Sequence, residues 1–117
     1  MSDLSVHFNR SEFACKCGCG YDTVDTKLIE AVEAVRVQFG PTTVTSGCRC
    51  PEHNEEVGGV KASQHVQGRA ADLQVSGVNP DEVAVFAMGL KGISVGRYNS
   101  FTHIDSRSGI EARWDNR

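Results

Sequence analysis

The chain has 117 residues and a mass of 12.7 kDa, which is the size of one domain. It is 39% hydrophobic and 23% charged with a formal net charge of −3, which predicts a globular protein without the basic surface of a general nucleic-acid binder. Apolar runs fall far short of the roughly 18 residues of a membrane span, and no basic-then-apolar segment follows Met1. We therefore expect no membrane association and no secretory signal.

The first half of the chain predicts one helix followed by one strand. Residues 1–25 are polar and rich in Gly and Cys, so we expect irregular structure there. Residues 26–39 repeat apolar side chains at helical spacing, with Asp25 or Thr26 as the N-cap, and Gly40-Pro41 ends this helix. The β-branched residues 42–46 predict a short strand, and residues 47–64 a long loop of the kind that often carries function.

The second half predicts a strand, a helix and a hairpin. Residues 69–75 fit a strand, and a helix runs from Asn79-Pro80-Asp81 to about Leu90, with proline at its first position. Residues 92–98 and 100–105 fit two strands joined by a tight turn. This order predicts an α+β fold for residues 1–117, a small single domain with a mainly antiparallel sheet flanked by helices.

Five cysteines form two clusters, a CxCxC run at Cys15, Cys17 and Cys19 and a CxC pair at Cys48 and Cys50. Thiolates from both clusters could hold a second, structural metal, although CxxC is the usual spacing in zinc sites. The alternative is reduced thiols that pair, including a bridge between the clusters, if the protein leaves the cell. Both interpretations stay open.

Two histidines and a carboxylate, His65, Asp72 and His103, form a typical ligand set for a catalytic zinc whose fourth position is left to water. Alternation puts Asp72 on one face of its strand, and His103 shares a face with Asp105 on another. Asp72 sits among apolar residues, where a carboxylate is costly to bury without a cation. Gly68 permits the turn that would bring His65 beside Asp72. The remaining histidines, His7 and His53, are expected to be surface residues.

Three sequence elements resemble one known family. They are SxHxxGxAxD at residues 63–72, SGxRxxxHN at residues 46–54, and Gly96-Arg97-Tyr98 followed by His103-Ile104-Asp105. Together they resemble the zinc D-Ala-D-Ala carboxypeptidase and murein endopeptidase family, which includes several phage endolysins and shares its fold with the hedgehog signalling domain. The resemblance covers about residues 8–114.

The resemblance implies an enzyme, a metallopeptidase that cuts D-amino-acid-containing bonds in bacterial peptidoglycan stem peptides or cross-links. It implies one catalytic zinc ion on His65, Asp72 and His103. It also implies that Arg49 engages a substrate carboxylate or carbonyl, which suits the planar fork of an arginine. Ser63 and Tyr98 would bind substrate as well. For Arg49 the alternative is a surface ion pair with Glu52.

The proton-transfer group departs from the family pattern. Many relatives carry a Glu three residues before the last ligand or a His two residues before it, where this chain has Ser100 and Phe101. Asp105 is the first candidate for the catalytic base, and the alternative is an acceptor that orients His103. Weaker candidates for the base are Glu55, Glu56, His53 and Tyr98. The departure leaves open a second function, a catalytically weak or inactive zinc-binding module that binds cell-wall peptide.

The remaining expectations concern partners and location. We expect a monomer that acts on peptidoglycan peptide without nucleic acid or membrane as partner. It would be made in the cytoplasm and act at the bacterial cell wall, with a phage or prophage origin. The one tryptophan, Trp114, either lines the substrate cleft or packs in the core.

Overall fold

The computed structural model describes residues 7–15, 24–47, 65, 68–107 and 111–115. In chain order its elements are the 3-10 turn η1 (Arg10–Glu12), α1 (Thr26–Phe39), β1 (Thr42–Ser46), β2 (Ala70–Val75), α3 (Pro80–Met88), β3 (Ser94–Arg97), β4 (Thr102–Asp105) and β5 (Arg113–Asp115). The predicted order of helices and strands is confirmed from α1 to β4. Strand β5 is an addition, because three residues are too few to show a strand pattern in the sequence.

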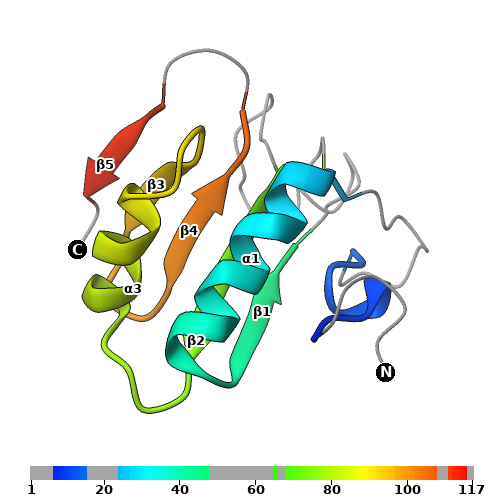
Figure 1. The fold of residues 1–117 in the computed structure, drawn as a ribbon, viewed down its shortest axis with the longest axis horizontal. Coiled ribbons are helices and arrows are strands. Elements are labelled where there is room, and N and C mark those ends of the chain that lie inside the picture. Colours follow the sequence, from blue (N-terminus) through cyan, green and yellow to red (C-terminus); the bar gives the residue numbers. More distant parts are fainter. Residues whose placement is uncertain (1–6, 16–23, 48–64, 66–67, 108–110, 116–117) are drawn as a thin grey trace.

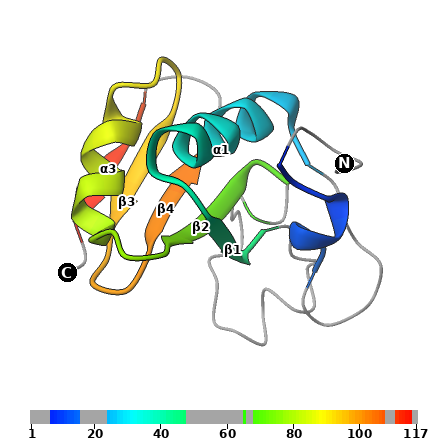
Figure 2. The same cartoon turned by 60° about the horizontal axis from the view of Figure 1, so that its bottom comes forward.

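The sheet is mostly antiparallel, and its strand order is β1-β2-β4-β3-β5. Strand β5 is the exception, since it runs parallel to β3 at the edge. Helices α1 and α3 lie against the same face of the sheet (Figures 1 and 2). The α+β class is therefore confirmed, with both described helices on one face. Within the described part of the chain, neither helix is long and apolar enough to cross a bilayer.

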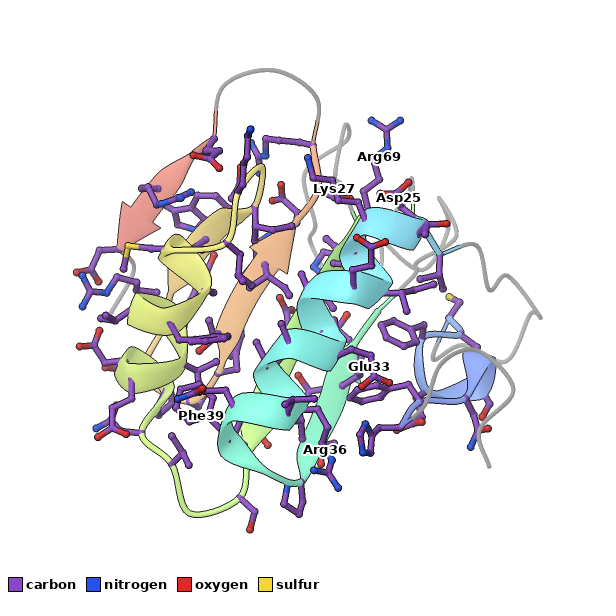
Figure 3. The ribbon with its side chains drawn as sticks, viewed as in Figure 1. Asp25, Lys27, Glu33, Arg36, Phe39 and Arg69 are labelled. Carbon is purple, nitrogen blue, oxygen red and sulfur yellow. The ribbon has the colours of Figure 1, made fainter. Side chains whose placement is uncertain are left out.

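The ends of α1 follow from local chemistry, with one difference from expectation. Asp25 occupies the N-cap position, but its carboxylate makes no capping bond and accepts a hydrogen bond from the Ser106 hydroxyl at 2.7 Å instead. Ser106 N also donates to the carbonyl of Arg69 at 2.9 Å, which ties the end of β4 to the start of α1 and of β2. Figure 3 shows Asp25 and Arg69 together at this end of α1. Gly40 ends the helix at φ 103°, a conformation that favours glycine.

Helix α3 is capped as the sequence predicts. The Asn79 side chain accepts a hydrogen bond from the Asp81 backbone N–H at 2.8 Å, and Pro80 occupies the first turn. The helix ends at Met88, two residues before the predicted Leu90. Helix α3 is fixed to the sheet because the Thr102 hydroxyl donates to the Pro80 carbonyl at 2.8 Å.

The hydrophobic core lies between the helices and one face of the sheet. Its members include Leu28, Ala31, Val32, Val35, Val83, Ala84 and Ala87 from the helices and Val44, Ala71, Leu73, Val75, Val95 and Ile104 from the strands. Because side chains alternate along a strand, burying Ala71, Leu73 and Ile104 turns Asp72, His103 and Asp105 to the opposite face. The face that points away from α1 and α3 therefore carries Asp72, His103 and Asp105, which the sequence analysis singles out.

The cysteine predictions rest mainly on residues outside the described part of the chain. Cys15 is described and is buried. Cys17, Cys19, Cys48 and Cys50 lie outside the described residues. A metal or a bridge between the two clusters therefore stays a prediction.

Candidate metal centre

His65, Asp72 and His103 come together on the face of the sheet that points away from α1 and α3. Strands β2 and β4 are neighbours, and their register sets Asp72 directly opposite His103. One ligand atom from each of the three residues lies within 4.8 Å of the other two. His65 and His103 are buried and Asp72 is half-buried. The structure thus brings together the three residues that the sequence predicts as metal ligands.

His65 is held in one orientation by a backbone carbonyl. Its Nδ1 lies 2.6 Å from the carbonyl oxygen of Gly47, which can only accept, so Nδ1 carries the proton. The other nitrogen, Nε2, then lies 3.5 Å from Oδ1 of Asp72. Nε2 and this carboxylate oxygen therefore face one another, an arrangement that a cation between them would stabilise.

Gly47 is positioned by an irregularity in β1. The register between β1 and β2 shifts between Val44 and Ser46, and bulges of this kind often re-aim the chain beside functional sites. A Cβ at position 47 would lie 2.6 Å from the carbonyl oxygen of Phe13, so only glycine fits. The close approach of the N-terminal segment thereby fixes the carbonyl that orients His65.

His103 lies between two carboxylates. Its Nε2 is 2.8 Å from Oδ2 of Asp105, and its Nδ1 is 2.9 Å from Oδ1 of Asp72. Asp105 has no exposed surface, and Arg107 binds both of its oxygens, from Nε at 2.8 Å and Nη2 at 2.7 Å. A buried carboxylate held in this way can only accept from His103. The inward-facing atom of the ring is therefore Nδ1, which points at Asp72.

The charges of these residues depend on one another. Burial alone would raise the pKa of Asp72, but hydrogen bonds from His103 and His65 lower it to about 2. Burial alone would lower the pKa of His103, yet hydrogen bonds to Asp105 and Asp72 raise it. Burial also opposes ionisation of Asp105, whereas the Arg107 and His103 hydrogen bonds lower its pKa below the ordinary value. The guanidinium of Arg107 and a proton on His103 therefore balance the two carboxylate charges.

The three inward-facing atoms fit a zinc ion. They are two imidazole nitrogens and one carboxylate oxygen, the donor set of catalytic zinc sites with an open position. Tetrahedral ligands at the usual zinc distances lie about 3.3 Å from one another. The two separations from Asp72 Oδ1, 3.5 Å to His65 and 2.9 Å to His103, lie on either side of that value. All three atoms can therefore serve as ligands of one metal ion.

Aromatic side chains form a wall beside His103. The centroid of the Trp114 ring lies 5.0 Å from that of His103, and the indole Nε1 donates to the Tyr98 hydroxyl at 2.9 Å. Tyr98 in turn stacks on Phe101 with ring centroids 4.4 Å apart. Trp114 is half-buried and lies outside the hydrophobic core cluster, which agrees with the interpretation that it lines the site.

Arg107 is a site residue that the sequence analysis missed. Its guanidinium binds Asp105 and also lies over the Trp114 ring, 5.2 Å from the ring centroid. The sequence did contain an indication of this pair. Arg107 lies two residues after Asp105, close enough for its side chain to bind that carboxylate where the strand ends. The arginine stands outside the motifs of the resemblance, and a carboxylate–arginine pair two residues apart is too common to single out.

Several predicted site residues lie outside the described part of the chain. These are Arg49, Glu52, His53, Glu55, Glu56 and Ser63. His7 is described, and it is an exposed residue whose Nδ1 lies 2.8 Å from Glu33 Oε2 on α1, in agreement with the predicted surface role. Tyr98 is described, as the acceptor of the Trp114 hydrogen bond.

The sequence matches the Peptidase M15 family over residues 6–105, and the chain belongs to this family. Among curated proteins, none matches the chain. Membership supports a zinc metallopeptidase with a peptide substrate, and the His65, Asp72 and His103 group could hold the metal. The resemblance noted in the sequence is thereby confirmed at the level of the family.

Proposed function

We propose that the protein is a zinc-dependent peptidase that hydrolyses D-amino-acid-containing bonds in bacterial peptidoglycan, in stem peptides or cross-links. The observation that carries this proposal is the convergence of His65 Nε2, Asp72 Oδ1 and His103 Nδ1 in a chain of the Peptidase M15 family. The substrate class comes from the likeness of its three motifs to those of cell-wall peptidases. One zinc ion per chain is sufficient for this activity.

Some residues of the site would bind the metal, and others hold those ligands in place. His65, Asp72 and His103 would bind zinc, with His65 fixed by the Gly47 carbonyl and His103 fixed by Asp105. When bound, zinc supplies Lewis acidity, which acidifies a water molecule and polarises a peptide carbonyl. The protein contributes orientation, because both imidazoles have their outer nitrogens engaged before the metal arrives.

For Asp105 the geometry favours the orienting role over the role of catalytic base. Both carboxylate oxygens are engaged, by His103 and by Arg107, and the side chain has no exposed surface. A general base must reach the proton that it removes, directly or through one water. The groups that Asp105 contacts are the outer nitrogen of His103 and the donors of Arg107. We therefore propose that Asp105 acts as the acceptor that sets the tautomer of His103.

Substrate binding would involve three further residues. We propose that Arg49 binds a carboxylate or carbonyl of the substrate, because its planar guanidinium can make two parallel hydrogen bonds. Ser63 would bind the peptide backbone. Tyr98 would line the cleft, where the Trp114 hydrogen bond and the Phe101 stack support its ring. The protein would act as a monomer at the bacterial cell wall after synthesis in the cytoplasm, and a phage or prophage origin fits this role.

The first experiment is the digestion of purified peptidoglycan by the zinc-loaded protein, with products identified by mass spectrometry. The His65→Ala variant should release no product, because it lacks one ligand. A matched control is His7→Ala, which removes an exposed histidine paired with Glu33 outside the site and should keep activity. Products that appear equally with His65→Ala would contradict the proposal. The new termini also decide between carboxypeptidase and endopeptidase action.

A second candidate function is a zinc-binding module that holds cell-wall peptide without cutting it. The observation in its favour is the absence of a free carboxylate beside His103 among the described residues, where Ser100 and Phe101 precede it and Asp105 is fully engaged. The remaining base candidates, Glu55, Glu56 and His53, lie outside the described residues. Zinc-dependent binding of peptidoglycan fragments without any product would favour this module over the peptidase.

A further inference from the structure

The indole of Trp114 packs directly on Gly96, in space that any larger residue at position 96 would fill. Strand β5 pairs with β3 so that Trp114 lies opposite Gly96, and β4 brings His103 opposite the same glycine. A Cβ on Gly96 would lie 2.4 Å from Cε2 of the indole and 2.5 Å from its Nε1. The glycine therefore leaves space for the indole to cross β3 and contact His103.

Three contacts hold the indole in its position above Gly96. Its ring lies 5.0 Å from His103 at an interplanar angle of 48°, and its Nε1 donates to the Tyr98 hydroxyl at 2.9 Å. The guanidinium of Arg107 lies over the indole, 5.2 Å from its centroid. Arg107 is also the residue that binds Asp105, the carboxylate at the outer nitrogen of His103. The indole thus touches His103 directly and contacts the arginine that supports the partner of that histidine.

Strand β5 is fixed to the sheet by contacts outside the metal centre. The Val95 backbone N–H donates to the Ala112 carbonyl at 3.0 Å, and the Ala112 N–H donates to the Ser94 hydroxyl at 2.8 Å. Arg113 Nη1 donates to the Ile93 carbonyl at 2.7 Å. A strand of only three residues is thereby held in register, which determines where Trp114 lies.

From this arrangement we infer that Trp114 is a positioning residue for the third metal ligand, and that docking of β5 on Gly96 completes the metal centre. This inference rests on the proposed zinc site. The two hydrogen bonds of His103 act at its nitrogens, at one edge of the ring. The indole adds a packing contact against the ring itself, which further restricts its movement. Zinc then binds a histidine whose orientation is already set.

The test compares four variants with the wild type. Trp114→Ala removes the indole, and Gly96→Ala displaces it without changing any polar group of the site. Trp114→Phe keeps an aromatic ring against His103 and loses only the bond to Tyr98. The matched control is Gly89→Ala on the C-cap of α3, where an added Cβ meets only the Phe86 carbonyl oxygen at 3.4 Å. Circular dichroism establishes that each variant is folded.

Two quantities are measured on each folded protein. The first is the zinc dissociation constant, from competition with a chromophoric chelator. The second is the set of ¹H chemical shifts of the His103 ring in the metal-free protein, which report the ring current of the indole without any metal. Trp114→Ala and Gly96→Ala should bind zinc about tenfold more weakly and lose the ring-current shift, as for the removal of other groups that orient metal ligands. Trp114→Phe should stay within about threefold of the wild type, and Gly89→Ala should be unchanged.

The outcomes separate this inference from the proposed function. Wild-type zinc affinity in both Trp114→Ala and Gly96→Ala would overturn the positioning role and leave the zinc site intact. Equal weakening in Trp114→Phe and Trp114→Ala would also overturn it, because the effect would then depend on the Tyr98 hydrogen bond and not on ring packing. A wild type that binds no zinc would overturn the proposed function together with this inference.

Discussion

Asp105 and its two partners show how much a single buried carboxylate determines in this site. It accepts from His103 at 2.8 Å and is bound by Arg107 through both oxygens. If Asp105 orients His103, Asp105→Asn should weaken zinc binding about 10–100-fold, because the amide loses the charge that both partners require. The measurement is the zinc dissociation constant of the folded variant.

The matched control for this variant is Asp81→Asn. Asp81 is also a carboxylate paired with an arginine, Arg97, but it belongs to α3. Its substitution should leave zinc affinity within experimental scatter. An Asp105→Asn variant that binds zinc like the wild type but has lost hydrolysis would assign Asp105 the role of base instead.

The pKa shifts predict how zinc binding depends on pH. Because the pKa of His103 is raised by Asp105 and Asp72, zinc must displace a proton from this ring over a wider pH range than from an ordinary histidine. As pH falls through the raised pKa of His103, zinc affinity should fall, at about tenfold per pH unit for one displaced proton. Asp72, whose pKa is lowered to about 2, stays ionised and adds no dependence in this range. Dissociation constants measured between pH 5 and 8 check this, and a flat profile would contradict it.

At the scale of the elements, the bulged end of β1 connects the N-terminal segment to the metal centre. Gly47 packs against the backbone of Phe13, and its carbonyl accepts the hydrogen bond of His65. Gly47→Ala should destabilise the protein by about 1–3 kcal/mol, because the added Cβ has no space. It should also weaken zinc binding, because the carbonyl that orients His65 must move. Denaturant unfolding and zinc titration test the two effects, and Gly89→Ala should change neither.

The contact between the end of β4 and the start of α1 gives a second prediction for an element. Ser106 donates from its hydroxyl to Asp25 and from its backbone to Arg69. Ser106→Ala removes the bond to Asp25 and should lower the free energy of unfolding by about 1 kcal/mol. The Arg107 backbone N–H donates to Asp105 Oδ1, directly beside Ser106. The variant should therefore also show faster hydrogen exchange at the Arg107 amide. Unchanged stability would show that water replaces the hydroxyl fully.

At the scale of the whole molecule, the core and the metal centre lie on opposite faces of one sheet. The core side chains of β2 and β4 pack under the helices, whereas Asp72 and His103 point to the other face. Removal of zinc should therefore leave the fold intact, unlike a structural site whose metal supplies the folding energy. After chelation, the far-ultraviolet circular dichroism should be unchanged.

Zinc should nevertheless raise the melting temperature by binding only the folded state. The gain is about 2.7 kcal/mol when free zinc is a hundred times its dissociation constant. Thermal melts over a series of zinc concentrations measure this, with His65→Ala as the variant that should not respond. Unfolding of the wild type on chelation would instead favour a structural role for the metal.

The sequence by itself determined the order of elements from α1 to β4, and it named the three residues that the fold brings together as candidate ligands. Helical spacing sets α1 at Thr26–Phe39 as predicted, and β-branched residues set β1 at Thr42–Ser46. These features are local, because side-chain alternation and turn residues act over a few positions. His65 and Asp72 could be named because their motif has a fixed spacing, and His103 because it lies in a second motif, His103-Ile104-Asp105.

Only the tertiary structure decided how the ligands are oriented. Folding brings distant segments together in two of the orienting contacts, the Gly47 carbonyl with His65 and the Trp114 ring with His103. A third contact, between Arg107 and Asp105, depends on how the chain turns after β4. Strand β5 escaped prediction because it is three residues long and is stabilised by pairing with β3. Such contacts depend on which segments of the backbone lie close together in the folded chain. Local sequence patterns do not predict this, because they extend over only a few residues.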